Sequence, residues 1–251
     1  MLKFSVPRAV RNTRSAAARR RPAPLRAVLA ALLAAATAAG AADEPSEAET
    51  ALFLTDHLQK LSPPMVLRYS FSKTGGLEKG FSDTVEVEIG KPDAGAGTRV
   101  VTRCLSGDRK VELPALDFAQ GNPALLCFLE RDIRQMERLT GGKANYFRKR
   151  IRLALAERAQ MRAVTIEVNG RPVEAREIRI TPYADDPLRE RFERYAGKYY
   201  VFRVAADIPG GLIEADAVIP DHSGSGRAGE EAPQLIEEVL KFAPVEESKE
   251  K

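Results

Sequence analysis

The first 42 residues contain no Asp or Glu, although they include Lys3 and seven arginines. An apolar run of Ala, Leu and Val follows from Ala27 to about Ala39, and Ala39-Gly40-Ala41 has the small-x-small pattern of a signal peptidase site. The run is shorter than the roughly 20 apolar residues that a membrane-spanning helix needs. We therefore predict a cleaved export signal over residues 1–41, a periplasmic location, and no transmembrane span after cleavage.

Two other targeting signals stay open as alternatives. An acid-free, Arg-rich N-terminus is also typical of a mitochondrial presequence. Arg19-Arg20-Arg21 resembles a twin-arginine signal, but Pro22 and Pro24 stand where apolar residues are expected. No Cys stands directly after the apolar run, which argues against a lipid-anchored mature N-terminus.

The charge of the chain changes sign without this segment. The full sequence has 39 basic and 35 acidic residues, a net charge of +4. Eight of the basic residues lie in the first 42, so the remainder has 31 basic residues against 35 acidic ones, a net charge of −4. A basic chain favours nucleic-acid partners, whereas this acidic remainder argues against them.

Residues for metal and nucleophilic chemistry are scarce. Trp is absent, and His57 and His222 have no neighbours at metal-ligand spacing. No P-loop and no Gly-x-Ser-x-Gly pattern is present. The sequence therefore predicts no metal and no cofactor, and favours a protein that is not an enzyme.

One acidic segment has a possible catalytic interpretation. Asp185 and Asp186 are adjacent, with Glu190 and Glu193 following, and paired carboxylates can act as acid and base on a glycoside. The simpler interpretation is that Asp186 caps a short helix that runs from Pro187 to about Ala196.

Hydrophobic spacing predicts an α+β fold. Period-two alternation indicates about eight strands, and Asn169-Gly170 is a strong hairpin signal. The expected strands are 65–71, 84–89, 99–105, 109–113, 164–168, 173–180, 199–205 and 212–219. Apolar residues at helical spacing predict helices over 49–61, 123–140 and 145–158. We expect a strongly curved antiparallel β-sheet, a half-barrel, with helices packed on one face.

The predicted domain spans residues 42–220, and residues 221–251 are interpreted as a flexible linker, a short helix and a charged tail. Leu235, Ile236, Val239 and Leu240 have the spacing of that helix. In the strand 173–180, Val173 and Ala175 are odd-numbered but Ile178 and Ile180 are even-numbered. This change of phase predicts a bulge or a bend in the sheet.

Cys104 and Cys127 are the only cysteines. Cys127 falls nearly opposite the apolar stripe of the helix 123–140, where a free thiol is not usually found. A disulfide between the two is our hypothesis for an oxidising compartment. A reactive thiol, or pairing with another chain, remains an alternative.

A basic segment follows the second cysteine. Lys143, Arg148, Lys149 and Arg152 lie on the predicted helix 145–158 or directly before it. We interpret them as candidate ligand-binding residues for an anionic group. The alternative is that they form the solvated face of an amphipathic helix, whose buried face is already supplied by Phe147, Ile151 and Leu155.

The segments GNPALLCFLERDIRQMERLTGG, NYFRKRIRLAL, TPYADDPLRERF and IPGG together resemble a family of secreted bacterial proteins without an assigned activity. The resemblance covers about residues 65–220. In architecture the chain is also remotely similar to periplasmic lipoprotein-carrier half-barrels.

This architecture implies a binding or carrier protein for an apolar or amphipathic ligand of the cell envelope, with a lipid, a lipoprotein or an envelope protein as partner. The ligand would lie between the curved sheet and the helices. A structural or interaction module without a cavity is the alternative hypothesis, and a hydrolase is a third.

Overall fold

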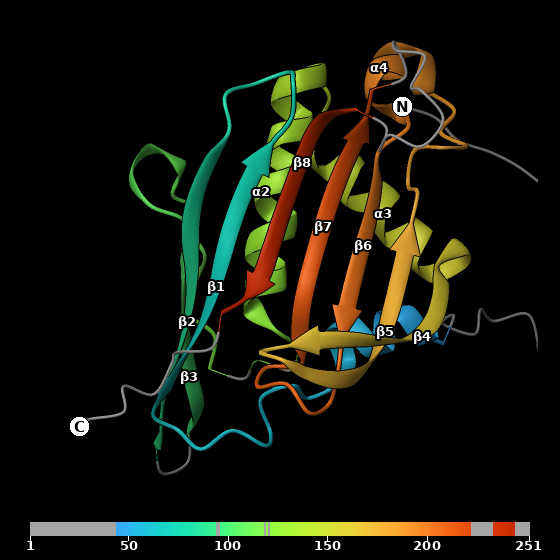
Figure 1. Ribbon diagram of the computed structural model, residues 1–251. Coiled ribbons are helices and arrows are strands. Elements are labelled where there is room, and N and C mark those ends of the chain that lie inside the picture. The colour runs from blue at the N-terminus through green and yellow to red at the C-terminus, as the bar shows by residue number, and fades with distance from the viewer. Residues whose placement is uncertain (1–43, 94–95, 118, 120, 222–232, 244–251) are drawn as a thin grey trace, which may run out of the picture. The chain divides into compact units, whose positions relative to one another are not determined.

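Eight strands form one antiparallel sheet in the computed structural model, in the order β3-β2-β1-β8-β7-β6-β5-β4 (Figure 1). The structure describes residues 44–93, 96–117, 119, 121–221 and 233–243. The strands are β1 (Met65–Thr74), β2 (Phe81–Asp93), β3 (Ala96–Cys104), β4 (Gln160–Val168), β5 (Arg171–Ile180), β6 (Tyr199–Val204), β7 (Leu212–Pro220) and β8 (Gln234–Phe242). Strands β3 and β4 are the two edges, so the sheet is not closed.

The last strand joins the two halves of the sheet. Strands β1 to β3 form one meander and β4 to β7 form another, and β8 lies between β1 and β7. Its partners across the ladders include Phe71 of β1 and Ala215 of β7, both opposite Leu240. The sheet therefore becomes continuous only when the C-terminal strand is in place.

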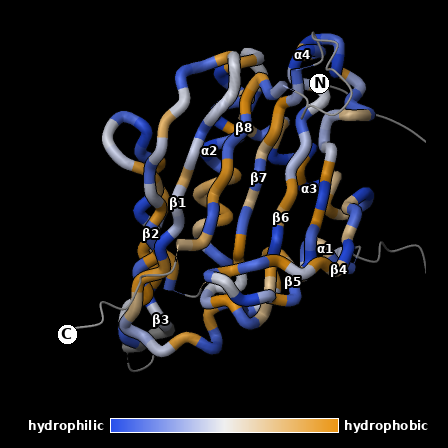
Figure 2. Tube along the Cα trace, in the orientation of Figure 1, coloured by the Kyte–Doolittle hydropathy of each residue, from blue (hydrophilic) through white to orange (hydrophobic). Residues whose placement is uncertain are grey.

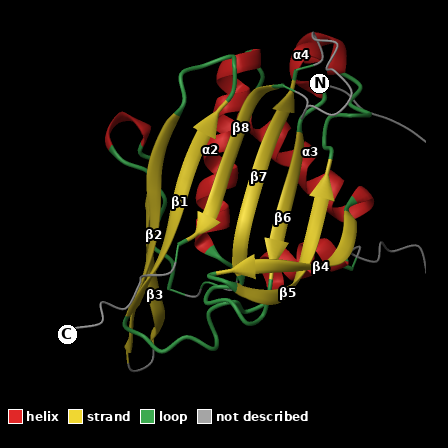
Figure 3. Cartoon of the chain, in the orientation of Figure 1, coloured by secondary structure: helices red, strands yellow, loops and turns green. Residues whose placement is uncertain are grey.

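Helices cover one face of the sheet. The two long ones are α2 (Pro123–Thr140) and α3 (Ala144–Arg158), and Figure 3 shows both behind the strands, with no helix of the described chain over the front. The short ones are α1 (Glu47–Glu49), η1 (Thr50–Leu54), η2 (Gly107–Arg109), η3 (Arg189–Phe192) and α4 (Glu193–Ala196). The predicted α+β fold, an antiparallel sheet with helices on one face, is thus confirmed.

The start and end of α2 follow the local signals in the sequence. The Asn122 side chain accepts a hydrogen bond from the Ala124 amide at 2.9 Å, and Pro123 occupies the first turn. The helix ends at Gly141, whose φ of 69° lies in the left-handed region. These signals fix the two ends of α2.

Side chains from the sheet and the long helices meet in one apolar core. Every second residue of β1 from Leu67 to Lys73 is buried, and Figure 2 shows hydrophobic and hydrophilic residues alternating along the strands. The largest fully buried side chains include Tyr69 and Phe71 of β1, Phe128 of α2, Phe147 of α3 and Phe202 of β6. The space between the two layers is therefore occupied by side chains of the protein itself.

The predicted hairpin at Asn169-Gly170 is present, with both residues in the left-handed region at φ 52° and 73°. The β4–β5 ladder keeps its register from Val168↔Arg171 to Gln160↔Arg179, so the change of phase in β5 is not a bulge between these strands. Ala175 packs in a small separate cluster with Val164 and Ile166, whereas Ile178 belongs to the main core. The hairpin bends across the end of the sheet (Figure 1), so its two parts bury opposite faces.

The predicted helix at residues 235–240 is wrong. These residues are part of β8, and Ile236, Glu238 and Leu240 are all buried. Every second residue from Ile236 to Leu240 is buried, as in a strand, but the middle one of the three is Glu238. The apolar residues of the segment, taken without Glu238, therefore have the spacing of a helix. The sheet domain consequently extends past residue 220 to Phe242.

Three smaller predictions need correction. The helix expected over 49–61 ends at Leu54, because the Thr55 backbone is extended. The helix expected from Pro187 to Ala196 is a 3₁₀ turn, η3, followed by the four residues of α4. The strand expected over 109–113 is a single bridge between Val111 and Cys104.

Cys104 and Cys127 form a disulfide with an Sγ–Sγ distance of 2.04 Å, which confirms the predicted pairing. Both residues are buried, and the bridge ties the end of β3 to the first turns of α2. The predicted export signal at 1–41, most of the linker and the charged tail lie outside the described residues. Among the described residues, no helix is both long and apolar enough to cross a membrane.

Candidate ligand-binding site

The interior between α2 and the sheet contains charged side chains as well as apolar ones. Asp132 of α2 is fully buried, pairs with the ammonium of Lys198, and accepts a 2.5 Å hydrogen bond from the Tyr200 hydroxyl. Burial, followed by the nearby Asp132 charge, raises the pKa of Tyr200 well above its usual value. Tyr200 therefore stays protonated and serves as a donor to the carboxylate.

A second buried carboxylate lies nearby on β8. Glu238 Oε1 accepts a hydrogen bond from Gln135 Nε2 at 2.7 Å and is 2.9 Å from Arg131 Nη2. Lys73 Nζ of β1 is 3.7 Å away and also pairs with Glu78. Burial raises the pKa of Glu238, while the Arg131 charge opposes this. Two helix residues thus anchor the strand that joins the halves of the sheet.

These buried pairs lie in the layer between α2 and the sheet, among buried residues of the core. The ligand position that we expected there, between the sheet and the helices, stays a prediction.

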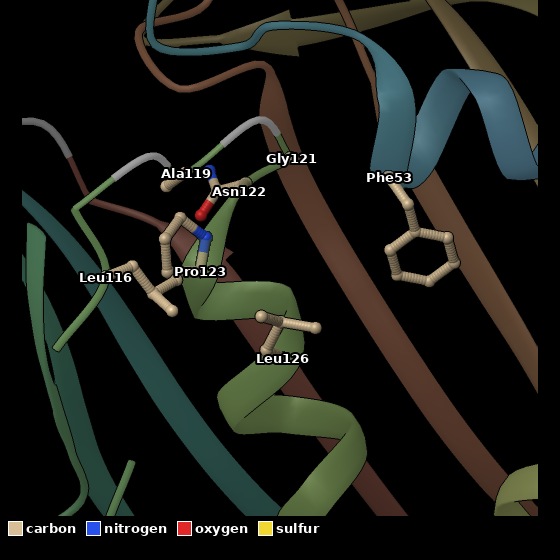
Figure 4. A pocket seen from close by; sticks show the side chains of 7 residues that line it. All are labelled: Phe53, Leu116, Ala119, Gly121, Asn122, Pro123 and Leu126. Carbon is tan, nitrogen blue, oxygen red and sulfur yellow. The ribbon is translucent and has the colours of Figure 1, made fainter. Parts of the chain in front are cut away.

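An open apolar hollow lies at the start of α2, and we call it the α2 hollow. It has a volume of about 320 Å³ and is lined by Phe53, Leu116, Ala119, Gly121, Asn122, Pro123 and Leu126. Figure 4 shows Phe53 of η1 on one side of the opening, Leu116 of the preceding loop on the other, and Leu126 of α2 between them. Leu126 is 41% exposed, a large apolar side chain in contact with water.

The chain approaches itself closely at this hollow. A Cβ on Gly121 would lie 2.9 Å from the carbonyl oxygen of Leu52 and 3.1 Å from the Cα of Phe53. Glycine at this position therefore allows η1 to lie against the loop before α2. The contact is what places the Phe53 ring opposite Leu126.

Among the described residues of the lining, Asn122 alone has a polar side chain, and its amide is already engaged. Its Nδ2 donates hydrogen bonds of 2.6 Å to the Tyr69 hydroxyl and to the Gly210 carbonyl. Its Oδ1 accepts from the Ala124 amide. The described side chains that line the hollow are therefore mainly apolar, which suits an alkyl chain or a ring.

The four basic residues predicted to bind a ligand fall into three environments. Arg148 is paired with Glu130 of α2, with Nη2–Oε2 at 2.8 Å, and also donates to Asn145. Lys143 lies at the turn between α2 and α3, at the far end of α2 from the hollow. Lys149 and Arg152 are exposed on α3 and have no ion-pair partner within the described ranges.

The Arg148–Glu130 pair links α2 and α3, and Figure 1 shows α3 running back obliquely, away from α2. One turn toward the C-terminus of α3 leads from Arg148 to Arg152, and one turn toward the N-terminus of α2 leads from Glu130 to Leu126. Arg152 and Leu126 therefore lie on the same side of the ion pair, the side on which the hollow lies.

The acidic residues that had a catalytic interpretation serve the fold. Asp186 accepts from the Leu188 amide at 2.8 Å, pairs with Arg150 at 2.9 Å and accepts from the Tyr146 hydroxyl. Asp185 pairs with Arg158 at 2.9 Å. The capping interpretation of Asp186 agrees with these contacts.

His57 Nε2 lies 2.8 Å from the Ala51 carbonyl oxygen, to which it donates. Its ring sits against Gly211. Among the described residues, no group of three or more His, Cys, Asp or Glu side chains is arranged to hold a metal ion.

Two other surface hollows are larger and have charged residues in their lining. One of about 720 Å³ is lined by residues that include Arg189, Glu193 and Arg194, and one of about 510 Å³ by residues that include Asp56, Lys60 and Asp207. The α2 hollow differs from both because the described residues of its lining include no charged side chain.

Sequence reasoning missed the lining of the α2 hollow. Phe53, Leu116 and Leu126 come from three segments that meet only in the fold. The available signal was Leu126, a leucine outside the apolar stripe of the helix 123–140.

No protein-family model matches the chain, and no curated protein matches it. Among solved structures, it is similar to the lipoprotein LppX of Mycobacterium tuberculosis, with 12% sequence identity and a TM-score of 0.31. The match covers 76% of this chain and 92% of that one. At this TM-score the likeness supports no statement about ligand or activity.

Proposed function

We propose that the protein is a non-enzymatic binding protein of the bacterial cell envelope, and that it binds the apolar part of an amphipathic ligand in the α2 hollow. The observation that carries this proposal is the apolar lining around the exposed Leu126 side chain. Removing apolar surface from water stabilises a complex by about 25 cal/mol per Å². The predicted export signal supports a periplasmic location.

The size of the hollow limits the ligand. Ligand pockets span roughly 300–1,000 Å³, and about 320 Å³ lies at the lower end of that range. We therefore expect a single alkyl chain or one small ring system to bind, with the rest of the ligand outside the hollow.

Binding of an uncharged apolar dye such as Nile red tests the proposal directly. The wild type should enhance its fluorescence, and Leu126→Glu should weaken binding at least about tenfold, or about 1.4 kcal/mol, because a carboxylate would enter the apolar lining. Leu188→Glu is the matched control, since Leu188 is also exposed, at 37%, but does not line the hollow.

Two results would overturn the proposal. One is a wild type that does not bind the dye or any single-chain amphiphile. The other is equal binding by the Leu126→Glu and Leu188→Glu variants. Native mass spectrometry of protein purified from its own periplasm should, in addition, show a co-purifying amphiphile.

An interaction module of the envelope is the second candidate function. The packed apolar core between the helices and the sheet favours it. This candidate predicts a stable protein partner and no uptake of amphiphiles, so the dye assay separates the two functions.

A further inference from the structure

We infer that the ligand of the α2 hollow carries a compact anionic head, a carboxylate or a phosphate, and that Arg152 and Lys149 bind this head. The inference rests on the proposed function, because it assigns the polar end of the ligand whose apolar end lies in the hollow. It depends on three features of the helix layer: register, unpaired charge and the polarity of the lining.

The Arg148–Glu130 pair relates the cations of α3 to the hollow. Arg152 lies one turn beyond this pair on the side of the hollow, and Lys149 lies next to Arg148, three residues before Arg152. Lys143 is nine residues from Arg152, or about 13 Å along the helix axis at 1.5 Å per residue. Lys143 is therefore too far from the hollow to share a head group with Arg152.

Charge separates the remaining candidates. Arg148 binds both carboxylate oxygens of Glu130, at 2.9 and 2.8 Å, and Asn145 as well, so its positive charge is already balanced. Arg152 and Lys149 are exposed without such a partner in the described part of the chain. A ligand can therefore bind these two cations without breaking an ion pair of the described chain.

The lining of the hollow forces the head group outward. Both amide hydrogens of Asn122 are engaged by Tyr69 and Gly210, so the described part of the lining has no side-chain donor left for an anion. An anion left in such a lining would lose its hydration without compensation. Its stable position is at the rim, where a guanidinium can bind a carboxylate or a phosphate through two parallel hydrogen bonds.

The test compares three single-chain ligands with the same dodecyl chain: dodecanoate, dodecyl phosphate and the uncharged 1-monododecanoylglycerol. Affinities are measured by displacement of Nile red, below the concentration at which each ligand forms micelles. We expect at least one anionic ligand to bind about tenfold tighter than the uncharged one, equivalent to about 1.4 kcal/mol. This preference should shrink at high salt, because the cations are exposed.

The double variant Arg152→Gln/Lys149→Gln should lose the preference and keep the affinity for 1-monododecanoylglycerol. The matched control is Lys79→Gln/Arg171→Gln, which removes two exposed cations on the sheet hairpins and should keep the preference. Comparison of dodecanoate with dodecyl phosphate identifies the head group.

Equal binding of charged and uncharged ligands by the wild type would overturn the inference and leave the proposed function standing. The same holds if the Arg152→Gln/Lys149→Gln variant keeps the preference. Failure of all three ligands to bind would instead contradict the proposed function, and the inference with it.

Discussion

The open face of the sheet and the outer face of the helix layer both carry many charged side chains, but the two faces differ in how many of these charges are ion-paired. On the open face, charged side chains of opposite sign alternate from strand to strand. On the outer face of α2 and α3, several cations have no partner in the described chain. The difference separates charge that belongs to the fold from charge that is available for binding.

The longest row on the open face crosses five strands. In register it runs Lys241, Glu214, Arg203, Glu177 and Arg162, from β8 to β4. Adjacent members are ion-paired, with distances of 3.4, 2.6, 3.0 and 2.6 Å in that order. A shorter row, Arg68–Glu86–Arg103, crosses β1 to β3. Cross-strand pairs of this kind stabilise a sheet.

The two long helices also have ion-paired cations, Arg138, Arg148 and Arg158, beside cations that lack an ion pair in the described chain. Lys149 and Arg152 have no ion pair among the described residues, and neither does Arg134 of α2. A fold that pairs charge across a whole sheet but leaves it unpaired on a helix next to an apolar hollow fits a binding role for that helix. Four predictions test this contrast, starting with the largest expected effect.

Arg203→Met should destabilise the protein most. Arg203 is only 23% exposed and contacts Glu177, Glu214 and Asp216 at 2.6 to 3.0 Å. Removing one partner of a largely buried ion pair leaves the other charge uncompensated, so we expect the free energy of unfolding to fall by about 3 kcal/mol. Urea unfolding measures the loss, with Arg171→Met as the control. A loss below about 1 kcal/mol would show that the row contributes little to stability.

Asp216 should make the stability of the open face depend on pH. Burial, and then the Glu214 charge, raises the pKa of its carboxyl to about 6, although Arg203 opposes this. Because the folded state holds the proton more tightly than the unfolded state, the contribution of this group is complete below about pH 4. It is lost as the pH rises to about 6.

The comparison is with Asp216→Asn, which cannot titrate. The free energy of unfolding of the wild type minus that of the variant should fall between about pH 4 and 6, by at most about 3 kcal/mol. Urea unfolding at a series of pH values gives this difference. A difference that stays constant or rises over that range would rule out the raised pKa.

The sequence predicted the fold class because apolar residues alternate along strands such as β1, where every second residue from Leu67 to Lys73 is buried. It failed at β8 for a specific reason. Glu238 occupies an interior position and is stabilised there by Gln135 and Arg131 of α2, which are remote in sequence. A buried charge is rare enough that an isolated glutamate is interpreted as solvent-facing, and so Leu235, Ile236, Val239 and Leu240 imitated a helix.

The candidate site was predictable only in part. Basic residues cluster in the sequence, so Lys143, Arg148, Lys149 and Arg152 could be named, but Glu130, which neutralises Arg148, lies 18 residues away on another helix. The α2 hollow needs η1 to approach the loop at Gly121, a tertiary contact without a local signal. Composition therefore indicated the charge of the site, and only the fold indicated its position.

Arg103→Met should have a small effect, because it removes an exposed member of the shorter row. Arg103 is 63% exposed, 2.7 Å from Glu88 and 3.5 Å from Glu86, and Glu86 keeps Arg68 as a partner. We expect a loss of at most about 1 kcal/mol, and less at high salt. Urea unfolding at two salt concentrations checks both. A larger, salt-independent loss would mean that exposed and buried pairs of the open face contribute equally.

Arg152→Gln/Lys149→Gln should have the smallest effect on stability, within about 0.5 kcal/mol of the wild type. Gln has nearly the same helix propensity as Arg and Lys, so α3 itself is not weakened. No ion pair within the described residues is broken, and removing two like charges three residues apart relieves a small repulsion.

Urea unfolding, in parallel with the ligand titrations, separates the two roles that a surface cation can have. If the variant unfolds more easily by over 1 kcal/mol, these residues support the fold as Arg203 does, and the two faces do not differ. If stability is unchanged while the preference for anionic ligands is lost, the charge on this helix serves binding.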